Sequence, residues 1–378
     1  MDSGASPRPS LAISSEVPAS ASDQEDSRQP SKRETYAAFL LAVGIWIVGL
    51  GVLIQHEFSL ILFLRSLHLP VLEALGDLGN QLGQGITLFG LCGIVALAGW
   101  MAAQPRWRQV GIDGVVAHAL AGVMTQFLKH AIGRPRPRFT HRDIWQFGPS
   151  LQSGLDAFPS GHASASFAVA AVLSRHVPQG SWLWYGLAGF VAISRVIRGS
   201  HFPTDVLAGA LLGFVVGYVW SRPLCQWRRS CYEAMMKSLP WGVCGFMIFW
   251  VPFHQGPPDG VGLVMLGGGS LMILSGMGWR WSAYWMSKQP HQLWPQLSRF
   301  FRVVSPANLL IVGGLACLTQ SLIVVGLTGA TIAAWTVGAV APPRFWEPKT
   351  GRQEVYLSGA VIGGAGLIAW MAGVVPVM

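Results

Sequence analysis

Apolar runs close to the length of a bilayer crossing recur along this chain from Tyr36 onward, with only short polar breaks between them. An α-helix needs about 20 mostly apolar residues to cross the hydrocarbon layer. Charged residues make up 11% of the chain and hydrophobic residues 51%, whereas soluble domains carry about a quarter of their residues as charges. The sequence therefore predicts an all-α, polytopic membrane helix bundle.

The first block of the chain, residues 35–222, is predicted to be a six-span core. Its apolar runs cover 36–55, 85–103, 109–128, 162–177, 182–198 and 204–221. A weaker stretch at 58–75 has Glu57, Arg65, His68 and Glu73 on one side of a helical pattern. Such a pattern favours a helix that lies along the membrane interface.

The two remaining segments differ strongly in composition. Residues 1–34 are rich in Ser, Pro, Asp and Glu, which predicts a disordered tail because too little apolar surface is available to offset the entropy of ordering. Residues 223–378 carry apolar runs near 240–253, 261–278, 305–325, 327–341 and 355–376. These runs predict four or five additional transmembrane helices, whose role no motif indicates.

Lysine and arginine lie in the short connections between apolar runs, not along one amphipathic face. This distribution is typical of membrane topology and not of a nucleic-acid surface. Cytoplasmic connections carry the excess of Lys and Arg, so the tail and the basic break at 222–237 are placed in the cytoplasm. The third-to-fourth and fifth-to-sixth connections then face outward.

Three blocks in these outward connections gather charged and polar residues where predicted spans end. They read KHAIGRPRP, FPSGHAS and SRVIRGSHFPTD. The first and third blocks supply three cations, Lys129, Arg136 and Arg195. Arginine forks and lysine ammonium groups stabilise the oxygens of a transferring phosphoryl group. Ser160 and Gly161 precede a helix start, where free N–H groups favour a phosphate.

Two histidines in the same blocks suggest a nucleophile and a general acid. They are His162 and His201. Asp205 follows His201 by four residues, so in a helix it lies one turn along on the same face and can accept the ring N–H. That contact would select the tautomer whose other nitrogen is free to attack phosphorus.

The complete pattern resembles the signature of the type 2 phosphatidic acid phosphatase superfamily. It consists of Lys129, Arg136 and Pro137, then Pro159, Ser160, Gly161 and His162, then Ser194, Arg195, His201 and Asp205. The resemblance covers about residues 36–221 and implies a metal-independent mechanism with no cofactor. His201 would attack phosphorus, His162 would protonate the leaving oxygen and then activate water, and Asp205 would orient His201. The resemblance gives the phosphoryl-binding role to Lys129, Arg136, Ser160, Gly161 and Arg195.

The expected protein is an integral membrane phosphatase that hydrolyses a phosphomonoester or pyrophosphate of a lipid through a phosphohistidine. The family implies undecaprenyl pyrophosphate, phosphatidic acid, phosphatidylglycerol phosphate and lipid A phosphates as candidate substrates. A bacterial inner membrane location, with the site facing the periplasm, follows from the same reasoning. The expected partners are the lipid substrate and membrane lipids. A phosphotransferase and a transporter that retains the motifs are the alternatives.

Four charged residues near the motifs lie outside the pattern. For Arg134, Arg138 and Arg198, anchoring to lipid headgroups is at least as well supported as contact with substrate. Asp156 is interpreted as a solvated residue of the outward loop.

Overall fold

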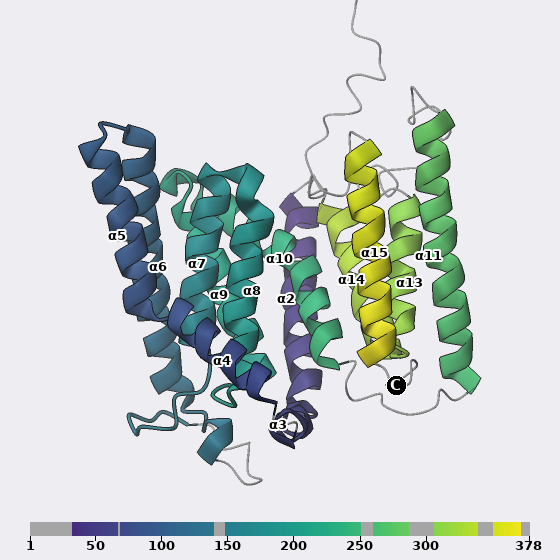
Figure 1. Ribbon diagram of the computed structural model, residues 1–378, viewed down its shortest axis with the longest axis horizontal. Helices are drawn as coiled ribbons and strands as arrows, with labels where there is room; N and C mark the ends of the chain where they lie inside the picture. The colour runs from purple at the N-terminus through teal and green to yellow at the C-terminus, as the bar shows by residue number, and fades with distance from the viewer. Residues whose placement is uncertain are drawn as a thin grey trace, which may run out of the picture.

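The computed structural model describes residues 32–66, 69–139, 148–250, 260–286, 306–338 and 351–371. Within these ranges every regular element is a helix, which confirms the predicted fold class (Figure 1). The first block forms α2 (Lys32–Ile54), α3 (Glu57–Ser66), α4 (Pro70–Leu82), α5 (Gly85–Met101), α6 (Pro105–Ile132), α7 (Gly161–His176), α8 (Ser181–Ile197) and α9 (Pro203–Trp220). The second block forms α10 (Trp227–Trp250), α11 (Gly260–Met286), α13 (Pro306–Leu318), α14 (Leu322–Gly338) and α15 (Gly351–Met371). Most of the predicted tail lies outside the described residues, and its last three residues begin α2.

The six apolar runs predicted in the first block correspond to α2 and to α5 through α9. By length and composition, α2, α6, α9 and, in the second block, α11 can each cross a membrane. Helices α4 and α5 meet that test together as a pair bent by 50°. Helices α7 and α8 have 16 and 17 residues, so the six-span count stays a prediction.

The centre of the first block is the contact between α7 and α9, which α6 and α8 flank. Small residues let these two helices approach closely. A Cβ built on Gly213 of α9 would lie 2.0 Å from the carbonyl oxygen of Ser164 on α7. At Gly217 the corresponding distance to the Ala168 oxygen is 2.3 Å. Glycine is therefore required along this face of α9, and the tight contact fixes the starts of both helices relative to each other.

The stretch predicted to lie along the interface forms two helices, α3 and α4, and α3 lies at one end of the bundle (Figure 1). Helix α4 continues to Leu82 and packs against α8. The acidic residue that opens α3, Glu57, is completely buried. Its predicted place on a polar face is therefore wrong, and its partners belong to the site described below.

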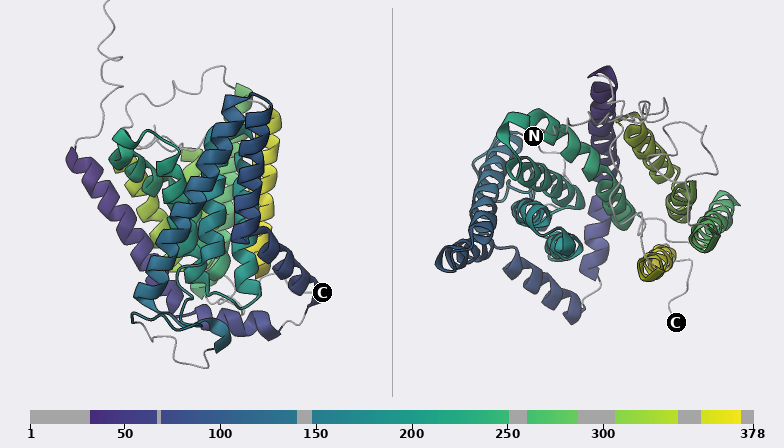
Figure 2. Two further views of the ribbon diagram at one scale, coloured as in Figure 1. Left: turned by 90° about the vertical axis from the view of Figure 1, so that its left-hand side faces the viewer. Right: turned by 90° about the horizontal axis from the view of Figure 1, so that it is seen from above.

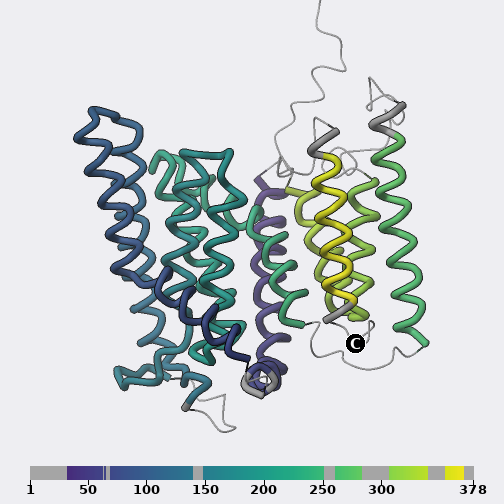
Figure 3. Tube along the Cα trace, viewed as in Figure 1, coloured from purple at the N-terminus to yellow at the C-terminus, as the bar shows by residue number. Residues whose placement is uncertain are grey.

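The second block joins the first through α10 and α14, which both pack against α2 (Figure 3). Helices α11, α13 and α15 lie farther from the core, on the far side of α2 and α10 (Figure 2). Arg280 links these three helices: its Nε donates to Glu354 Oε1 at 2.8 Å, and its Nη1 donates to Asn308. The long apolar stretch at 305–341 turns at Gln320, whose φ is +54°.

Candidate active site

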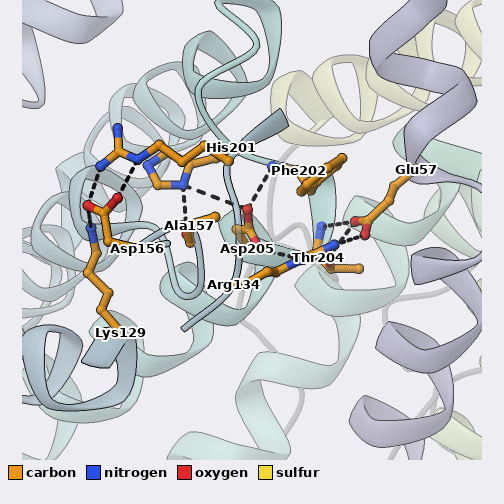
Figure 4. A network of polar contacts seen from close by, with 10 residues as sticks. Glu57, Lys129, Arg134, Asp156, Ala157, His201, Phe202, Thr204 and Asp205 are labelled. Atoms are coloured by element: carbon orange, nitrogen blue, oxygen red, sulfur yellow. Dashed lines mark hydrogen bonds and ion pairs between the residues drawn. The ribbon is translucent and has the colours of Figure 1, made fainter. Parts of the chain in front are cut away.

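The three motif blocks lie at one end of the first block of helices, as Figure 4 shows for several of their residues. Lys129 occupies the last turn of α6 and Arg195 the last turn of α8. His162 lies in the first turn of α7, and His201 precedes α9. His162 is close enough to His201, Lys129, Arg136 and Arg195 for electrostatic interaction with each of them.

A left-handed glycine directs the chain from α6 into the site. Gly133 has a φ of +61° and its N–H donates to the Lys129 oxygen at 2.8 Å. A Cβ at Gly133 would lie 1.9 Å from the Gly148 oxygen. Both the backbone conformation and the available space therefore demand glycine. This turn places Arg136 beside the end of the helix that carries Lys129.

The two cations of the first motif share one carboxylate, that of Asp156. Lys129 Nζ lies 3.4 Å from Asp156 Oδ2, and Arg136 Nε donates to Oδ1 at 2.8 Å. Burial opposes ionisation, but the two cations hold the pKa of the Asp156 carboxyl well below its usual range. The interpretation of Asp156 as a solvated loop residue is therefore wrong. An anionic carboxylate lies where the motif predicts phosphate oxygens.

His201 is held by a backbone carbonyl. Its Nδ1 lies 2.8 Å from the Ala157 oxygen, and only 2% of the residue is exposed. A carbonyl can only accept, so in the neutral ring Nδ1 carries the proton and Nε2 keeps its lone pair. Burial, with the charges of Lys129 and Arg195, lowers the pKa of His201 in spite of nearby Asp205. The neutral nucleophilic form is therefore favoured.

Asp205 lies beside His201 but does not hold its N–H as expected. The distance from Asp205 Oδ2 to His201 Nδ1 is 3.7 Å, which is longer than a hydrogen bond. The carboxylate instead accepts from the Phe202 N–H at 2.8 Å. The Asp205 carbonyl oxygen accepts from the Ser160 N–H, also at 2.8 Å, which ties the start of α9 to that of α7. Asp205 acts on His201 through its charge.

A buried guanidinium, that of Arg134, contacts the far side of the Asp205 carboxylate (Figure 4). Its Nη1 donates to Asp205 Oδ1 at 2.5 Å and to Thr204 Oγ1 at 2.8 Å, and its Nη2 pairs with Glu57. The Arg134 Cζ atom lies 4.3 Å from the centre of the Phe202 ring. Arg134 is 0% exposed, so both headgroup anchoring and substrate contact are wrong for it.

One cation in this cluster faces two carboxylates. Burial opposes ionisation of Arg134, but the charges of Asp205 and Glu57 raise its pKa. Burial raises the pKa of Glu57 to about 7, against the attraction of Arg134. Loss of solvation is the main cause, and the nearby charge of Asp205 raises this pKa further, because the Arg134 guanidinium is shared between two buried anions. No spacing in the sequence links Glu57 to Arg134, so sequence reasoning missed this pair.

The α4 helix adds two polar residues at the edge of the site. Arg195 donates to the Asn80 side-chain oxygen, and Arg198 pairs with Asp77. The Arg198 pair is half exposed at the surface. Sequence reasoning did not single out Asn80 or Asp77, because both lie between the amphipathic stretch at 58–75 and the apolar run that begins at 85, where no motif was found.

Three buried polar atoms of the motif residues have no hydrogen-bond partner within the described ranges: His162 Nε2, Ser160 Oγ and Arg195 Nε. A buried polar group without a partner is costly. A bound phosphoryl group would offer acceptors to hydroxyl and guanidinium donors of this kind. Over the same ranges, no group of three His, Cys, Asp or Glu side chains is arranged to hold a metal ion.

Comparison with known proteins places this end of the molecule in one family. The family model described as "PAP2 superfamily" matches residues 112–229. That segment begins within α6 and ends within α10, so it includes every residue of the three motif blocks. The second block beyond α10 lies outside the match.

Several curated proteins are similar to this chain. A lipid A 1-phosphatase of Porphyromonas gingivalis is 31% identical over 125 residues, which are 32% of this chain and 25% of that protein. A decaprenylphosphoryl-5-phosphoribose phosphatase of Mycobacterium tuberculosis is 34% identical over 33% of this chain and 67% of its own length. The bacitracin transport permease protein BcrC of Bacillus licheniformis is 26% identical over 46% of this chain and 91% of its own length.

Coverage of these relatives varies widely. The chain spans 25% of the Porphyromonas protein and 39% of a lipid A 1-phosphatase of Rhizobium johnstonii. Among solved structures, the crystal structure of Aquifex aeolicus LpxE is 23% identical, with a TM-score of 0.33 over 43% of this chain and 93% of that one.

Proposed function

We propose that this chain, which belongs to the PAP2 superfamily, hydrolyses a phosphate ester or pyrophosphate of a membrane lipid through a phosphohistidine on His201. The observation that carries the proposal is the environment of His201. Its Nδ1 is held by the Ala157 carbonyl, so Nε2 is the free nitrogen. The cations Lys129, Arg136 and Arg195 lie around the same end of the bundle.

The reaction has two steps in this scheme, formation of the phosphohistidine and its hydrolysis. The bound anionic phosphoryl group offsets the surrounding cations and favours the protonated form of His162. His201 Nε2 attacks phosphorus and forms an N–P bond, while the P–O bond to the lipid breaks and this protonated His162 gives its proton to the leaving oxygen. Neutral His162 then takes a proton from water, and that water attacks phosphorus and releases phosphate from His201. Lys129, Arg136 and Arg195 stabilise the oxygens that carry the charge.

Asp205 and Asp156 have different tasks in this scheme. Asp205 lies 3.7 Å from the His201 ring, so its charge stabilises the positive ring that forms during attack. Asp156 must leave Lys129 and Arg136 when a phosphoryl group binds, because both cations donate to its carboxylate. Ser160 and the start of α7 complete the phosphoryl site.

The helices indicate a membrane location, and we propose which membrane this is and which side the site faces. The chain is an integral membrane protein with several helices that are long and apolar enough to span a bilayer. The Lys and Arg distribution supports an orientation in which the catalytic end faces away from the cytoplasm. Together with the bacterial origin of the relatives described above, this supports a bacterial inner membrane with the site facing the periplasm.

The test is phosphate release by purified protein in detergent from undecaprenyl pyrophosphate, phosphatidic acid, phosphatidylglycerol phosphate and lipid A. We expect release from at least one of these, with and without a chelator. His201→Ala should abolish it, whereas His176→Asn, at the other end of α7, should not. Release that persists in His201→Ala would refute the mechanism. Phosphate transfer to another lipid without free phosphate would identify a phosphotransferase instead.

A further inference from the structure

A cavity of about 350 Å³ lies between α8, α9 and α10, with Trp46 of α2 also in its wall. The volume is in the range of small-molecule sites. The lining residues are almost all apolar. The Ser238 hydroxyl accepts from Trp46 Nε1 at 2.9 Å and donates to the Met235 carbonyl oxygen at 2.7 Å, so these groups already have partners. None of the lining residues is charged, so the cavity suits a hydrocarbon chain.

The cavity opens toward the bilayer. Among its lining residues, Trp182 is 77% exposed, Trp241 48% and Ile248 40%. These side chains come from α8 and α10, which both line the cavity. A chain from a neighbouring lipid can therefore enter between these two helices.

Cations lie one to two helical turns beyond the cavity on two of its walls. On α9, Phe214 lines the cavity, and Tyr218 packs against it with the ring centres 5.6 Å apart. The Arg222 guanidinium lies over the Tyr218 ring at 3.3 Å. On α10, Trp241 lines the cavity, and Lys237 precedes it by one turn.

The polar contacts join these cations into one cluster. Lys237 Nζ donates to the Tyr218 hydroxyl at 2.9 Å. Arg222 Nη1 donates to the backbone carbonyl oxygen of Tyr218 at 2.8 Å. Arg175, at the end of α7, lies within electrostatic range of both Lys237 and Arg222. We call Arg175, Arg222 and Lys237 the inner cation cluster.

The inner cation cluster carries excess positive charge. Glu233 is the carboxylate that acts on it within the described ranges, and it already accepts from the Tyr218 hydroxyl at 2.9 Å and from Arg229 Nε at 3.0 Å. The hydrogen bonds of Arg222 go to uncharged oxygens. One acidic side chain, shared with a fourth cation, cannot neutralise three others. An anion is therefore the complementary ligand.

We propose that the cavity and the inner cation cluster together bind one anionic phospholipid, with its phosphate at the cations and one alkyl chain in the cavity. The site is distinct from the catalytic one. Tyr218 follows Asp205 by 13 residues on α9, which at 1.5 Å per residue is about 20 Å along the helix. In the membrane orientation proposed above, on which this assignment rests, the phospholipid comes from the cytoplasmic leaflet, opposite the catalytic end. Helix α10 of the second block supplies one wall, which gives that helix a role in lipid binding.

Native mass spectrometry of delipidated protein, titrated with phosphatidylglycerol or phosphatidylcholine, tests this proposal. We expect phosphatidylglycerol to bind about tenfold more tightly, because each surface cation contributes measurably to anionic-lipid affinity. Arg222→Gln with Lys237→Gln should abolish the preference. Lys237→Arg should keep it. Arg228→Gln is the matched control, since it removes one charge from an exposed position in the same basic stretch.

A cavity variant tests the alkyl-chain part separately. A Cβ on Gly189, which lines the cavity, meets no atom within 4 Å, so the side chain of Gly189→Leu begins in open space and can occupy part of the cavity. We expect it to weaken both lipids severalfold while the melting temperature of the lipid-free protein is unchanged. Equal affinity of the wild type for the two lipids would overturn the proposal. So would unchanged phosphatidylglycerol affinity in Gly189→Leu, or a loss in Arg228→Gln as large as in the double variant.

Discussion

Replacing Arg134 with glutamine removes the one cation from a buried cluster that contains two carboxylates. The side chains of Arg134, Glu57 and Asp205 are all 0% exposed. Without the guanidinium, both carboxyl groups must be protonated or remain as uncompensated buried charges. Breaking a buried ion pair from one side costs about 3–5 kcal/mol. We expect Arg134→Gln to lower the free energy of unfolding by at least that amount.

Glu57→Gln perturbs the same cluster from the other side and should cost less. It leaves Arg134 paired with Asp205, so the charges balance one to one. Burial raises the pKa of Glu57 to about 7, which means that the folded protein tolerates the neutral carboxyl near neutral pH. The expected loss is that of hydrogen bonds to Arg134 and Thr204, about 1–2 kcal/mol.

The contribution of Glu57 to the free energy of unfolding should depend on pH in a definite direction. The pKa of Glu57 is higher in the folded state than its ordinary 4.5, so the folded state binds more protons between these values. The stabilisation is complete below about pH 4.5 and is lost as the pH rises through about 7. Glu57→Gln cannot titrate, so it should remove this part of the decline.

Thermal unfolding in detergent, followed by tryptophan fluorescence, measures both effects. At about 2 °C per kcal/mol, Arg134→Gln should lower Tm by at least ~6 °C and Glu57→Gln by less than ~4 °C. Arg138→Gln, at an exposed position, is the control for loss of a positive charge and should change Tm little. A loss in Arg134→Gln no larger than in Glu57→Gln would refute the assignment of one cation to two carboxylates.

Three further predictions concern the site. Asp156→Asn should lower the inhibition constant of orthovanadate about tenfold, because the carboxylate no longer competes for the two cations it bridges; weaker inhibition would show that Asp156 mainly positions them. Burial lowers the pKa of His201, so the acid limb of kcat/KM that reports this residue should lie below about pH 6.5, the ordinary histidine value, and an acid limb above that pH would contradict the buried geometry. Gly133→Ala, with φ +61° and a Cβ 1.9 Å from the Gly148 oxygen, should cost at least about 2 kcal/mol in unfolding experiments, and an unchanged Tm would contradict the predicted strain.

The sequence predicted the helical fold class because the free energy of transfer from water to the bilayer is a property of each side chain and does not depend on distant residues. A run such as 36–55 specifies a helix for the bilayer whatever lies next to it. The motif residues were predictable for a related reason: Lys129, His162 and His201 each lie at the end of an apolar run. Short connections keep such ends at a membrane surface. Local pattern therefore limits where these side chains can meet.

Pairings between distant residues depended on the tertiary structure alone. Glu57 had the pattern of an interfacial acid and Arg134 that of a headgroup anchor, yet each is buried against the other. Asp156 had the pattern of a solvated loop residue, yet it forms an ion pair within the site. Asp205 was expected to hold the His201 ring, but the Ala157 carbonyl oxygen holds it.

The chain by itself thus determined the helical fold class and predicted which motif residues gather at one end of the helices. Only the packing of α3, α7 and α9 decided which charges are buried and which atom holds the nucleophile. The physical reason is that the energy of a charge depends on burial and on partners within a few ångströms. Segments far apart in the chain supply those partners, and no local pattern encodes them.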